Sequence, residues 1–188
     1  MSFSQAHQDL FVLAMLPNST GTYLDIGAND PTSINNTYLL ERQGWKGLSI
    51  DINTTYKQRH ATQRTNPFLV ADATSIPWSE VLPAHYSTSV IDYLTFDVDE
   101  ASDAAFRNFP WETYTFKVIT IEHDSYRFGT TVRDHMRKVL STLGYVCVCK
   151  DIKNQGNPYE DWWVHPTHVP SAVYMPYLCE GKEWSSVI

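Results

Sequence analysis

Two short apolar segments of the sequence each carry an aspartate where the chain is about to turn. Asp25 lies in the run Tyr-Leu-Asp-Ile-Gly that ends at Gly27, and Asp51 closes the later run Gly-Leu-Ser-Ile-Asp. Open α/β sheets hold nucleoside cofactors at the carboxyl ends of such strands. A pyrophosphate needs several glycines around it, but this turn has only Gly27 among acidic groups. Carboxylates suit the ribose hydroxyls and the cationic amino and sulfonium groups of S-adenosylmethionine (SAM), so the pattern predicts this cofactor.

Each candidate cofactor residue has an expected role. Gly27 would let the methionine portion approach the backbone, because a side chain would fill the same space. Asp25 could accept a hydrogen bond from the amino group, and Asp51 could accept from both ribose hydroxyls. Asp72 follows a third predicted strand, where it faces the adenine amino group or, as the simpler alternative, only completes a turn. The candidate set is Asp25, Gly27, Asn36, Asp51, Asp72 and Asp97, and the competing interpretation is an ordinary turn of a parallel sheet.

Acidic residues also follow the predicted fourth and fifth strands. Because adjacent parallel strands end at the same edge, these groups are expected to come within reach of one another. Several like charges in a small site need a cation, which would be either the sulfonium or a divalent metal. Oxygen ligands favour Mg²⁺ or Ca²⁺, whereas zinc would need more His or Cys than His123 offers. The alternative is that these groups face solvent or cap helices; the candidate metal ligands are Asp97, Asp99, Glu122 and Asp124.

His123, between two of these acidic residues, is the candidate general base, with Asp97 as the second catalytic candidate. An imidazole titrates near neutral pH and can accept the proton of an attacking hydroxyl group. The rest of the catalytic effect would come from holding oxygen, methyl carbon and sulfur in line. The alternative is that His123 is a hydrogen-bonded structural residue.

The elements that must position these residues alternate between strands and helices. This alternation predicts an α/β protein with a doubly wound, mostly parallel sheet flanked by helices. One antiparallel strand is allowed at an edge. We expect helices over residues 5–15, 35–43, 53–64 and 131–143, and strands over residues 23–27, 47–51, 68–71, 91–98, 117–122, 145–150 and 162–165.

Composition limits the class of protein and its partners. A chain of 188 residues with 43% hydrophobic residues is expected to form a single domain, 1–188, whose segment 166–188 could wrap over the domain or be partly disordered. The net charge of −7 disfavours nucleic acids and anionic membranes as partners. No targeting segment or membrane span is evident, which favours the cytoplasm, and association with a second copy remains open.

Several short motifs in a fixed order resemble the FkbM family of SAM-dependent methyltransferases. The resemblance implies a class I methyltransferase fold and methyl transfer to oxygen, commonly on a sugar or natural-product hydroxyl. The motifs are Ser4-Gln5 with Gln8-Asp9, Tyr23-Leu24-Asp25-Ile26-Gly27-Ala28, Asn35-Asn36-Thr37-Tyr38, Gly44-Trp45-Lys46-Gly47, Ile50-Asp51, Ile91 to Val98, Val118 to His123, Gly144-Tyr145 and Glu160-Asp161-Trp162-Trp163.

The sequence departs from the family pattern at two turns. Pro31 follows the first strand where a small acidic-glycine turn is usual, and Asp99-Glu100 replaces a Glu-Gly pair after the fourth strand. Proline supplies no amide, and loss of glycine removes a permissive backbone position. The alternative function is therefore a cofactor-binding protein of the same fold with weak or absent turnover. A nucleotide-dependent oxidoreductase is disfavoured by the missing glycines.

The acceptor is expected to be a small hydroxylated molecule, for which a glycan is one candidate. Aromatic faces pack against sugar C–H surfaces, and carboxylates bind sugar hydroxyls. Alternation along a strand would leave only one of two adjacent tryptophans facing the acceptor, and both could equally belong to the core. The candidate acceptor residues are Glu160, Asp161, Trp162 and Trp163.

Overall fold

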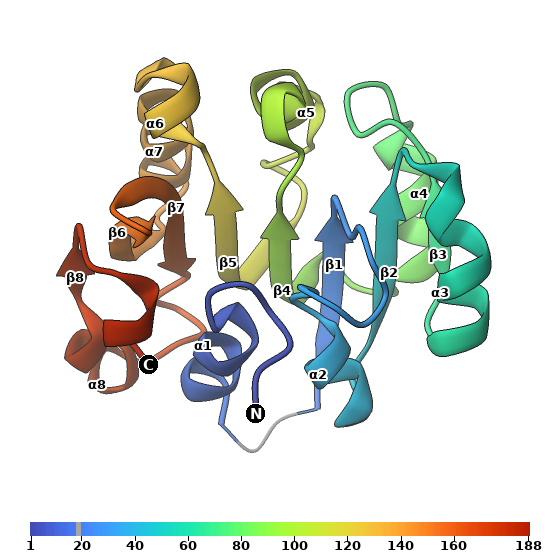
Figure 1. Ribbon diagram of the computed structural model, residues 1–188, viewed down its shortest axis with the longest axis horizontal. Helices are drawn as coiled ribbons and strands as arrows, with labels where there is room; N and C mark the ends of the chain where they lie inside the picture. Colours follow the sequence, from blue (N-terminus) through green and yellow to red (C-terminus); the bar gives the residue numbers. More distant parts are fainter. Residues whose placement is uncertain (18–19) are drawn as a thin grey trace.

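The computed structural model of the protein describes residues 1–17 and 20–188. Within these residues, eight strands form one sheet in the spatial order β3-β2-β1-β4-β5-β7-β6-β8 (Figure 1). The strands are β1 (Thr22–Ile26), β2 (Lys46–Asp51), β3 (Phe68–Val70), β4 (Val90–Phe96), β5 (Thr115–Glu122), β6 (Val146–Asn154), β7 (Asn157–Val164) and β8 (Cys179–Glu180).

Strands β1 to β5 are parallel, so their carboxyl ends share one edge of the sheet (Figure 1). Ile26, Phe96 and Ile121 lie side by side across β1, β4 and β5, and the residues that follow them therefore meet at this edge. The predicted mostly parallel, helix-flanked sheet is confirmed. The antiparallel strand is β7, which lies between β5 and β6 rather than at an edge, because β6 and β7 form a hairpin that inserts its second strand beside β5.

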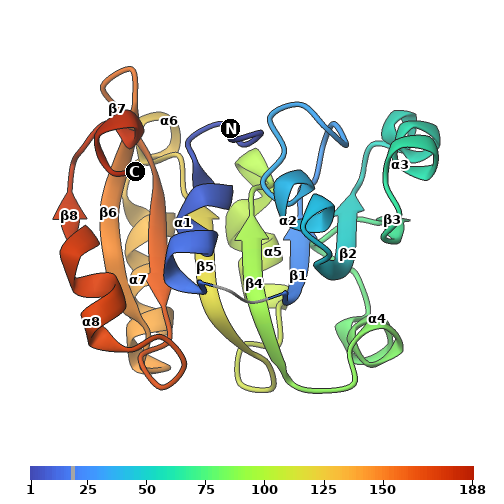
Figure 2. The ribbon, with the colours of Figure 1, turned by 90° about the horizontal axis from the view of Figure 1, so that it is seen from below.

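Helices cover both faces of the sheet. On one face α4, α5 and α7 pack Leu82, Phe106 and Leu140 against the strands. On the other face α1 and α2 pack Phe11 and Leu40 (Figure 2). The helices are α1 (Gln8–Met15), α2 (Tyr38–Arg42), α3 (Lys57–Gln63), α4 (Trp78–His85), α5 (Ser102–Asn108), α6 (Ser125–Phe128), α7 (Thr131–Thr142) and α8 (Ser171–Tyr174), with short 3₁₀ helices at Thr54–Tyr56, Asp99–Ala101, Met175–Tyr177 and Trp184–Ser186.

The sequence does not predict α4 or α5. Helix α4 contains Pro83, which lacks a backbone amide, and α5 spans only seven residues, too few for a helical period to stand out. Burial explains why both nevertheless form, since Trp78 of α4 and Phe106 of α5 lie in the core. None of the helices in residues 1–17 and 20–188 is both long and apolar enough to cross a membrane.

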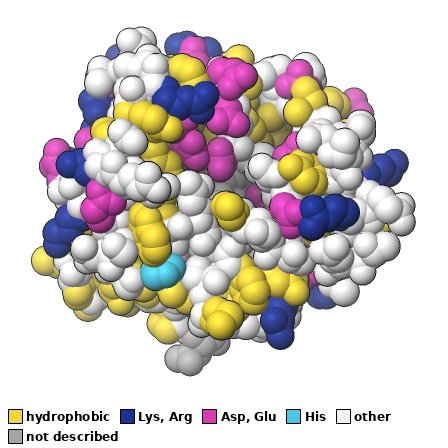
Figure 3. Space-filling model, viewed as in Figure 1, with side chains coloured by type: hydrophobic (Ala, Val, Ile, Leu, Met, Phe, Trp, Pro, Cys, Tyr) yellow, Lys and Arg dark blue, Asp and Glu magenta, His cyan; other side chains and the backbone are white. Residues whose placement is uncertain are grey.

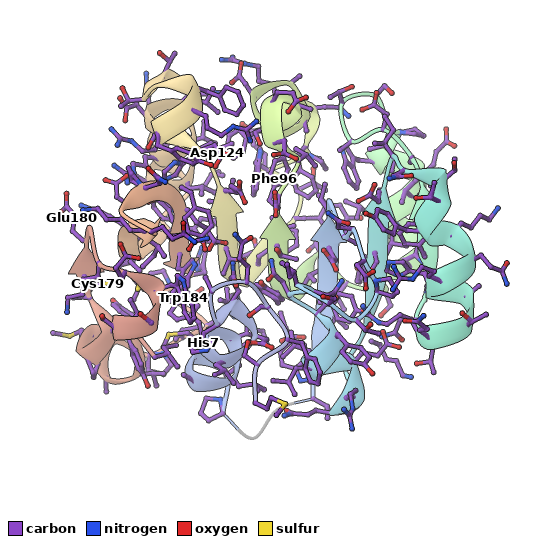
Figure 4. All side chains as sticks on the ribbon, viewed as in Figure 1. His7, Phe96, Asp124, Cys179, Glu180 and Trp184 are labelled. Carbon is purple, nitrogen blue, oxygen red and sulfur yellow. The ribbon has the colours of Figure 1, made fainter. Side chains whose placement is uncertain are left out.

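Residues 166–188 wrap along the edge of the sheet that β6 and β8 form. The ring of Trp184 packs edge-on against His7, just before α1, with 4.7 Å between ring centres (Figure 4). The Nδ1 atom of His7 also lies 3.0 Å from the carbonyl oxygen of Ile188. Of the two alternatives that the sequence left open for this segment, the structure has the wrapped one.

Candidate active site

A cavity of about 470 Å³ lies at the carboxyl edge of the parallel strands. Its volume falls within the range of small-molecule sites. Acidic side chains gather around this hollow in the upper half of the face seen in Figure 3. The cavity brings together these candidate residues from the sequence: Gly27, Asp51, Asp72, Asp97, Asp99, Glu122 and Asp124.

Gly27 permits the end of β1 to approach the end of β4. Its φ of +87° is a conformation that side chains disfavour, and a Cβ there would lie 1.5 Å from the carbonyl oxygen of Asp97. The amide of Gly27 donates to the carbonyl of Ile50 at 2.9 Å, which ties the turn to β2 as well. Glycine is therefore required at this position by the close backbone contact, whatever occupies the cavity.

Asp51 organises the cavity end of β2 and still keeps acceptor capacity. One carboxylate oxygen accepts from the amide of Asn29 and the other from the amide of Asn53, each at 2.8 Å. A carboxylate has about four acceptor positions, so the remaining lone pairs can accept from ligand hydroxyls. Asp72 accepts from the hydroxyl and amide of Thr74, which lower its pKa, so it both completes a turn and lines the cavity.

The loop after β1 is held by buried polar groups. Asn35 donates from its side chain to the carbonyls of Ala28 and Asp30, each at 3.0 Å. Pro31 lacks an amide, but its carbonyl accepts from Arg64 at 2.9 Å. Arg64 also donates to Glu41 at 2.6 Å, and both side chains are buried. The proline turn is thus part of a hydrogen-bonded loop.

Asp97 and Glu122 form a half-buried, hydrogen-bonded pair of carboxyl groups in the lining of the cavity. Burial raises the pKa of Asp97, and the charges of Asp99 and Asp124 raise it further. Burial and the charge of Asp97 likewise raise the pKa of Glu122 well above its usual range. The pair therefore holds a proton at neutral pH, because two adjacent half-buried carboxylates cannot both ionise at low cost.

Arg127 supplies a positive charge beside the acidic cluster, which consists of Asp97, Asp99, Glu122 and Asp124. Its guanidinium donates to Asp99 at 3.0 Å and to Asp124 at 2.9 Å. Asp124 lies at the end of β5, just before α6, with a left-handed φ of 44° (Figure 4). This backbone conformation turns the chain so that α6 presents Arg127 to both carboxylates.

The predicted metal ligands are only partly brought together. Single oxygens of Asp99, Glu122 and Asp124 lie within 4.8 Å of one another, a donor set that hard cations prefer, while Asp97 lies outside this group. Arg127 already pairs with two of these three carboxylates. A divalent ion would have to displace the guanidinium, so the residues as arranged do not fit a resident metal.

Asp25 and Asn36 lie outside the lining of the cavity. Asp25 is buried and accepts from the hydroxyl of Thr37 at 2.7 Å and from that of Ser49 at 3.4 Å. Asn36 donates to the hydroxyl of Thr95 at 2.8 Å. The structure therefore places both residues behind the site, where Asp25 joins β1 to Thr37 and Ser49, and Asn36 joins the segment before α2 to β4.

Burial raises the pKa of Asp25 to about 6, which gives a testable effect on stability. Because the folded state keeps this proton to higher pH than the unfolded chain does, stability falls as pH rises through the interval from about 4 to about 6. We expect Asp25→Asn to remove this loss and to raise the free energy of unfolding at pH 7.5 by about 1–2 kcal/mol more than at pH 4.5.

Urea unfolding at the two pH values measures the effect of Asp25→Asn. Titration of every other buried carboxyl group is common to both proteins and cancels in the difference. The matched control is Glu80→Gln, which neutralises an exposed carboxylate on α4 and should give the same change at both pH values. An Asp25→Asn difference no larger than that of the control would contradict the assignment.

His123 is turned away from the cavity. Its Nε2 atom lies 3.5 Å from Asp161 and 3.7 Å from Asp151, and its Nδ1 atom accepts from the amide of Ser125 at 3.2 Å. Neighbouring residues at a strand end point to opposite faces, so Glu122 and Asp124 reach the cavity and His123 between them does not. The structure therefore does not place His123 together with Asp97 as a pair of catalytic groups.

The four candidate acceptor residues of β7 are all buried and outside the cavity lining. Glu160 accepts from Gln8 at 3.0 Å and from the indole of Trp162 at 2.8 Å. Asp161 receives two hydrogen bonds from Arg137, at 2.7 and 2.8 Å. Trp162 and Trp163 are 0% and 1% exposed, in the cores on opposite faces of the sheet. All four residues belong to the interior, which for Trp162 and Trp163 is the alternative interpretation of the sequence.

Several lining residues escape the sequence analysis because no motif marks them. They come from loops or short helices, where the spacing of residues in the sequence does not show which way their side chains point. A partial signal exists for Arg127, because a lone basic residue just after a run of acidic residues is a candidate counter-ion. The residues concerned are Asn29, Tyr56, Tyr126 and Arg127.

Comparison with known proteins relates the fold to solved methyltransferases. An O-methyltransferase from Bacillus cereus, solved in complex with SAH, matches with a TM-score of 0.58 and 14% identity over 87% of this chain and 82% of that chain. The O-methyltransferase TomG from Streptomyces achromogenes, involved in tomaymycin synthesis and solved with SAM, matches with a TM-score of 0.56 and 11% identity over 87% and 81% of the two chains.

The S. pombe Dnmt2 methyltransferase also matches, with a TM-score of 0.55 and 16% identity over 77% of this chain. The present chain spans about half of that protein, 48% of its length. No protein-family model and no curated protein sequence matches this chain. The likenesses establish a Rossmann-like class I methyltransferase fold.

Proposed function

We propose that the protein is a SAM-dependent methyltransferase that acts on a hydroxyl group of a small acceptor. The observation that carries this proposal is the convergence of Gly27, Asp51, Asp72 and the Asp97–Glu122 pair around one cavity at the carboxyl edge of the sheet. The fold is that of solved methyltransferases, two of which contain SAM or SAH. The narrower assignment to FkbM-like O-methyltransferases is supported by the sequence motifs.

The cavity offers groups that match the parts of the donor. Asp51 is assigned to the ribose hydroxyls and Asp72 to the adenine amino group, because both carboxylates accept hydrogen bonds and line the cavity. The acidic cluster complements the positive amino and sulfonium groups. When bound, SAM supplies a methyl group on a positively charged sulfur atom.

Asp97 is assigned as the general base in this proposal. Its pKa is raised by burial and neighbouring charge, which brings a carboxylate into the range useful for proton transfer at neutral pH. The acceptor oxygen forms a bond to the methyl carbon, and the sulfur keeps the electron pair of the broken bond. The hydroxyl proton passes to the carboxylate of Asp97. Glu122 holds the proton of the pair and so lowers the electrostatic cost of ionised Asp97.

Calorimetry tests the donor assignment. We expect SAM and SAH to bind and NAD to bind more weakly, because acidic residues repel a pyrophosphate. Asp51→Ala should raise the dissociation constant of SAM by about 10- to 100-fold, since hydrogen bonds to charged groups contribute about 1.5–3 kcal/mol. Glu80→Ala on α4 is the control and should leave affinity unchanged. Equal affinity of the Asp51 variant and the wild type would remove Asp51 from the donor site.

A turnover assay distinguishes between two hypotheses, an enzyme and a cofactor-binding protein of the same fold. Methylated product from a panel of hydroxylated acceptors supports the enzyme, and SAM binding without any product across the panel supports the binding protein. The net charge of −7 supports uncharged acceptors over nucleic acids. Failure to bind both SAM and SAH would overturn the proposal as a whole.

A further inference from the structure

We propose that Cys179 is a site of reversible oxidation and that Cys149 captures the oxidised sulfur as a disulfide, which fastens β8 to β6. This inference does not depend on the proposed methyl transfer. Cys149 lies in β6 and Cys179 begins β8, and the two residues are register partners in the parallel pairing of these strands. Neighbouring strands lie about 4.8 Å apart, within the Cα separation of about 4.4–6.8 Å that a disulfide spans. Both residues are free thiols in the structure.

The two thiols lie on the same face of the sheet. Cys149 belongs to the core on the α1 side, and Cys179 packs against that same core. The thiol of Cys149 donates to the carbonyl of Tyr177 at 3.4 Å, so its side chain points towards the segment that leads into β8. Cys147, two residues earlier in β6, packs against the core on the opposite face. The fold therefore brings Cys149 to Cys179 and directs the third cysteine of the chain to the other side of the sheet.

The two thiols differ in access and in acidity. Cys149 is 0% exposed, whereas Cys179 is partly exposed at the start of β8, on the outer edge of the sheet (Figure 4). A hydrogen bond from Cys149 lowers the pKa of Cys179, as does the charge of Lys182. The same hydrogen bond and burial raise the pKa of Cys149. Because the thiolate is the form that reacts and access is needed, Cys179 is the first target of a small oxidant.

The oxidant of this proposal is hydrogen peroxide. The thiolate sulfur of Cys179 attacks one peroxide oxygen and becomes a sulfenic acid, while the O–O bond breaks and the other oxygen leaves as hydroxide. The sulfur of Cys149 then attacks the sulfenic sulfur, the S–O bond breaks, and the hydroxyl group leaves as water with the thiol proton of Cys149. Two thiols are thereby oxidised to one disulfide, and one peroxide is reduced to two molecules of water. A dithiol reductant reverses the reaction by thiol–disulfide exchange.

The disulfide would anchor a segment that joins distant parts of the chain. Strand β8 is only two residues long and pairs with β6 at Cys179 and the next residue. Beyond it, Trp184 packs against His7 just before α1, and Glu183 accepts from the amide of Gly156 in the turn between β6 and β7. A bond between the two cysteines closes a loop of about 30 residues and restricts local opening of this segment.

Mass spectrometry of the full chain after treatment with hydrogen peroxide, with alkylation of the remaining thiols, tests the disulfide. We expect the monomer to lose the mass of two hydrogen atoms and to keep one alkylated thiol, on Cys147. Cys147→Ala is the matched control and should form the same disulfide at the wild-type rate. Cys149→Ala should form no disulfide within the chain, and dimedone, which labels sulfenic acids, should then mark Cys179. In urea the pairing of the strands is lost, so Cys147 should also enter disulfides.

Cys179→Ser provides a second variant that should remain folded, because residue 179 is only partly buried. Its buried Cys149 should stay reduced under the same treatment. A disulfide of the folded wild type that includes Cys147 would overturn the proposal. So would a Cys179 that does not react, or one that is oxidised to the sulfinic acid while Cys149 remains a thiol.

Hydrogen exchange measures whether the disulfide fastens β8. The amide of Gly181 donates to the carbonyl of Lys150 at 2.9 Å, so its exchange rate reports separation of β8 from β6. We expect oxidation to slow this exchange at least about tenfold and dithiothreitol to restore the original rate. The amide of Ala71, which donates to Asp51 at the other edge of the sheet, is the internal control and should exchange equally in both states. Equal exchange of Gly181 in the oxidised and reduced proteins would overturn the fastening of β8.

Discussion

Asp97→Asn is expected to lower turnover by about 10²- to 10⁴-fold, the contribution typical of a positioned general base. The amide keeps the shape of the carboxyl group but cannot accept the hydroxyl proton. It also removes one charge from a half-buried acidic pair, so the variant should fold at least as well as the wild type. SAM affinity should fall far less than turnover does, because Asp99 and Asp124 still complement the positive groups of the donor and the ribose and adenine contacts are made elsewhere.

Single-turnover rates across a pH series check this expectation. The wild-type rate should rise with pH towards neutrality as Asp97 ionises, and the variant should show a flat profile. Asp92→Asn is the matched control, since Asp92 lies on the same strand, β4, outside the lining of the cavity, and pairs with Lys117 at 2.7 Å. A variant that keeps the wild-type rate and pH profile would assign proton removal to another group.

Gly27→Ala should lower the free energy of unfolding by at least about 3 kcal/mol and abolish detectable SAM binding. Two costs combine at this position. A Cβ would lie 1.5 Å from the carbonyl oxygen of Asp97, and the φ of +87° is unfavourable for alanine. Relief of the contact requires the ends of β1 and β4 to separate, which would move the residues that line the cavity.

Gly144→Ala separates these two costs. Gly144, just after α7, has a similar φ of +89°, but the nearest atom to a Cβ built there is Nε2 of His165 at 4.0 Å. It should therefore cost only about 1 kcal/mol, the conformational part of the effect, and leave SAM affinity unchanged. Chemical denaturation and calorimetry on both variants provide the comparison. If the two substitutions destabilise equally, the close approach of β1 and β4 is not what requires glycine at residue 27.

The sequence predicts the parallel half of the fold because hydrophobic runs and turn residues are local signals. The run ending at Gly27 and the run ending at Asp51 are strands whose ends line the cavity, as expected. Helix α4 is missed because Pro83 obscures its pattern and its stability comes from packing Trp78 into the core. The same limit applies to the β6–β7 hairpin, whose full length depends on pairing rather than on composition.

Site residues are harder to predict because residue type and position in the sequence do not determine where a side chain points. Glu122 and Asp124 reach the cavity, whereas His123 between them faces Asp161 on the other side of the sheet. Side chains alternate in direction along a strand, so the direction of each can be predicted once that of one neighbour is known. Asp25 shows the same difficulty, since its carboxylate is directed to Thr37 behind the site. Arg127 is found only through the fold, which brings α6 to the acidic cluster.

The insertion of β7 between β5 and β6 has an evolutionary consequence. It carries the tip of the hairpin to the same rim as the parallel strands while leaving that tip outside the segments that form the proposed donor pocket. Substitutions at the tip of the hairpin therefore leave the pairing of β1 to β5 undisturbed. In the proposed enzyme, this part of the rim is free to vary while the strands that would hold the donor stay the same.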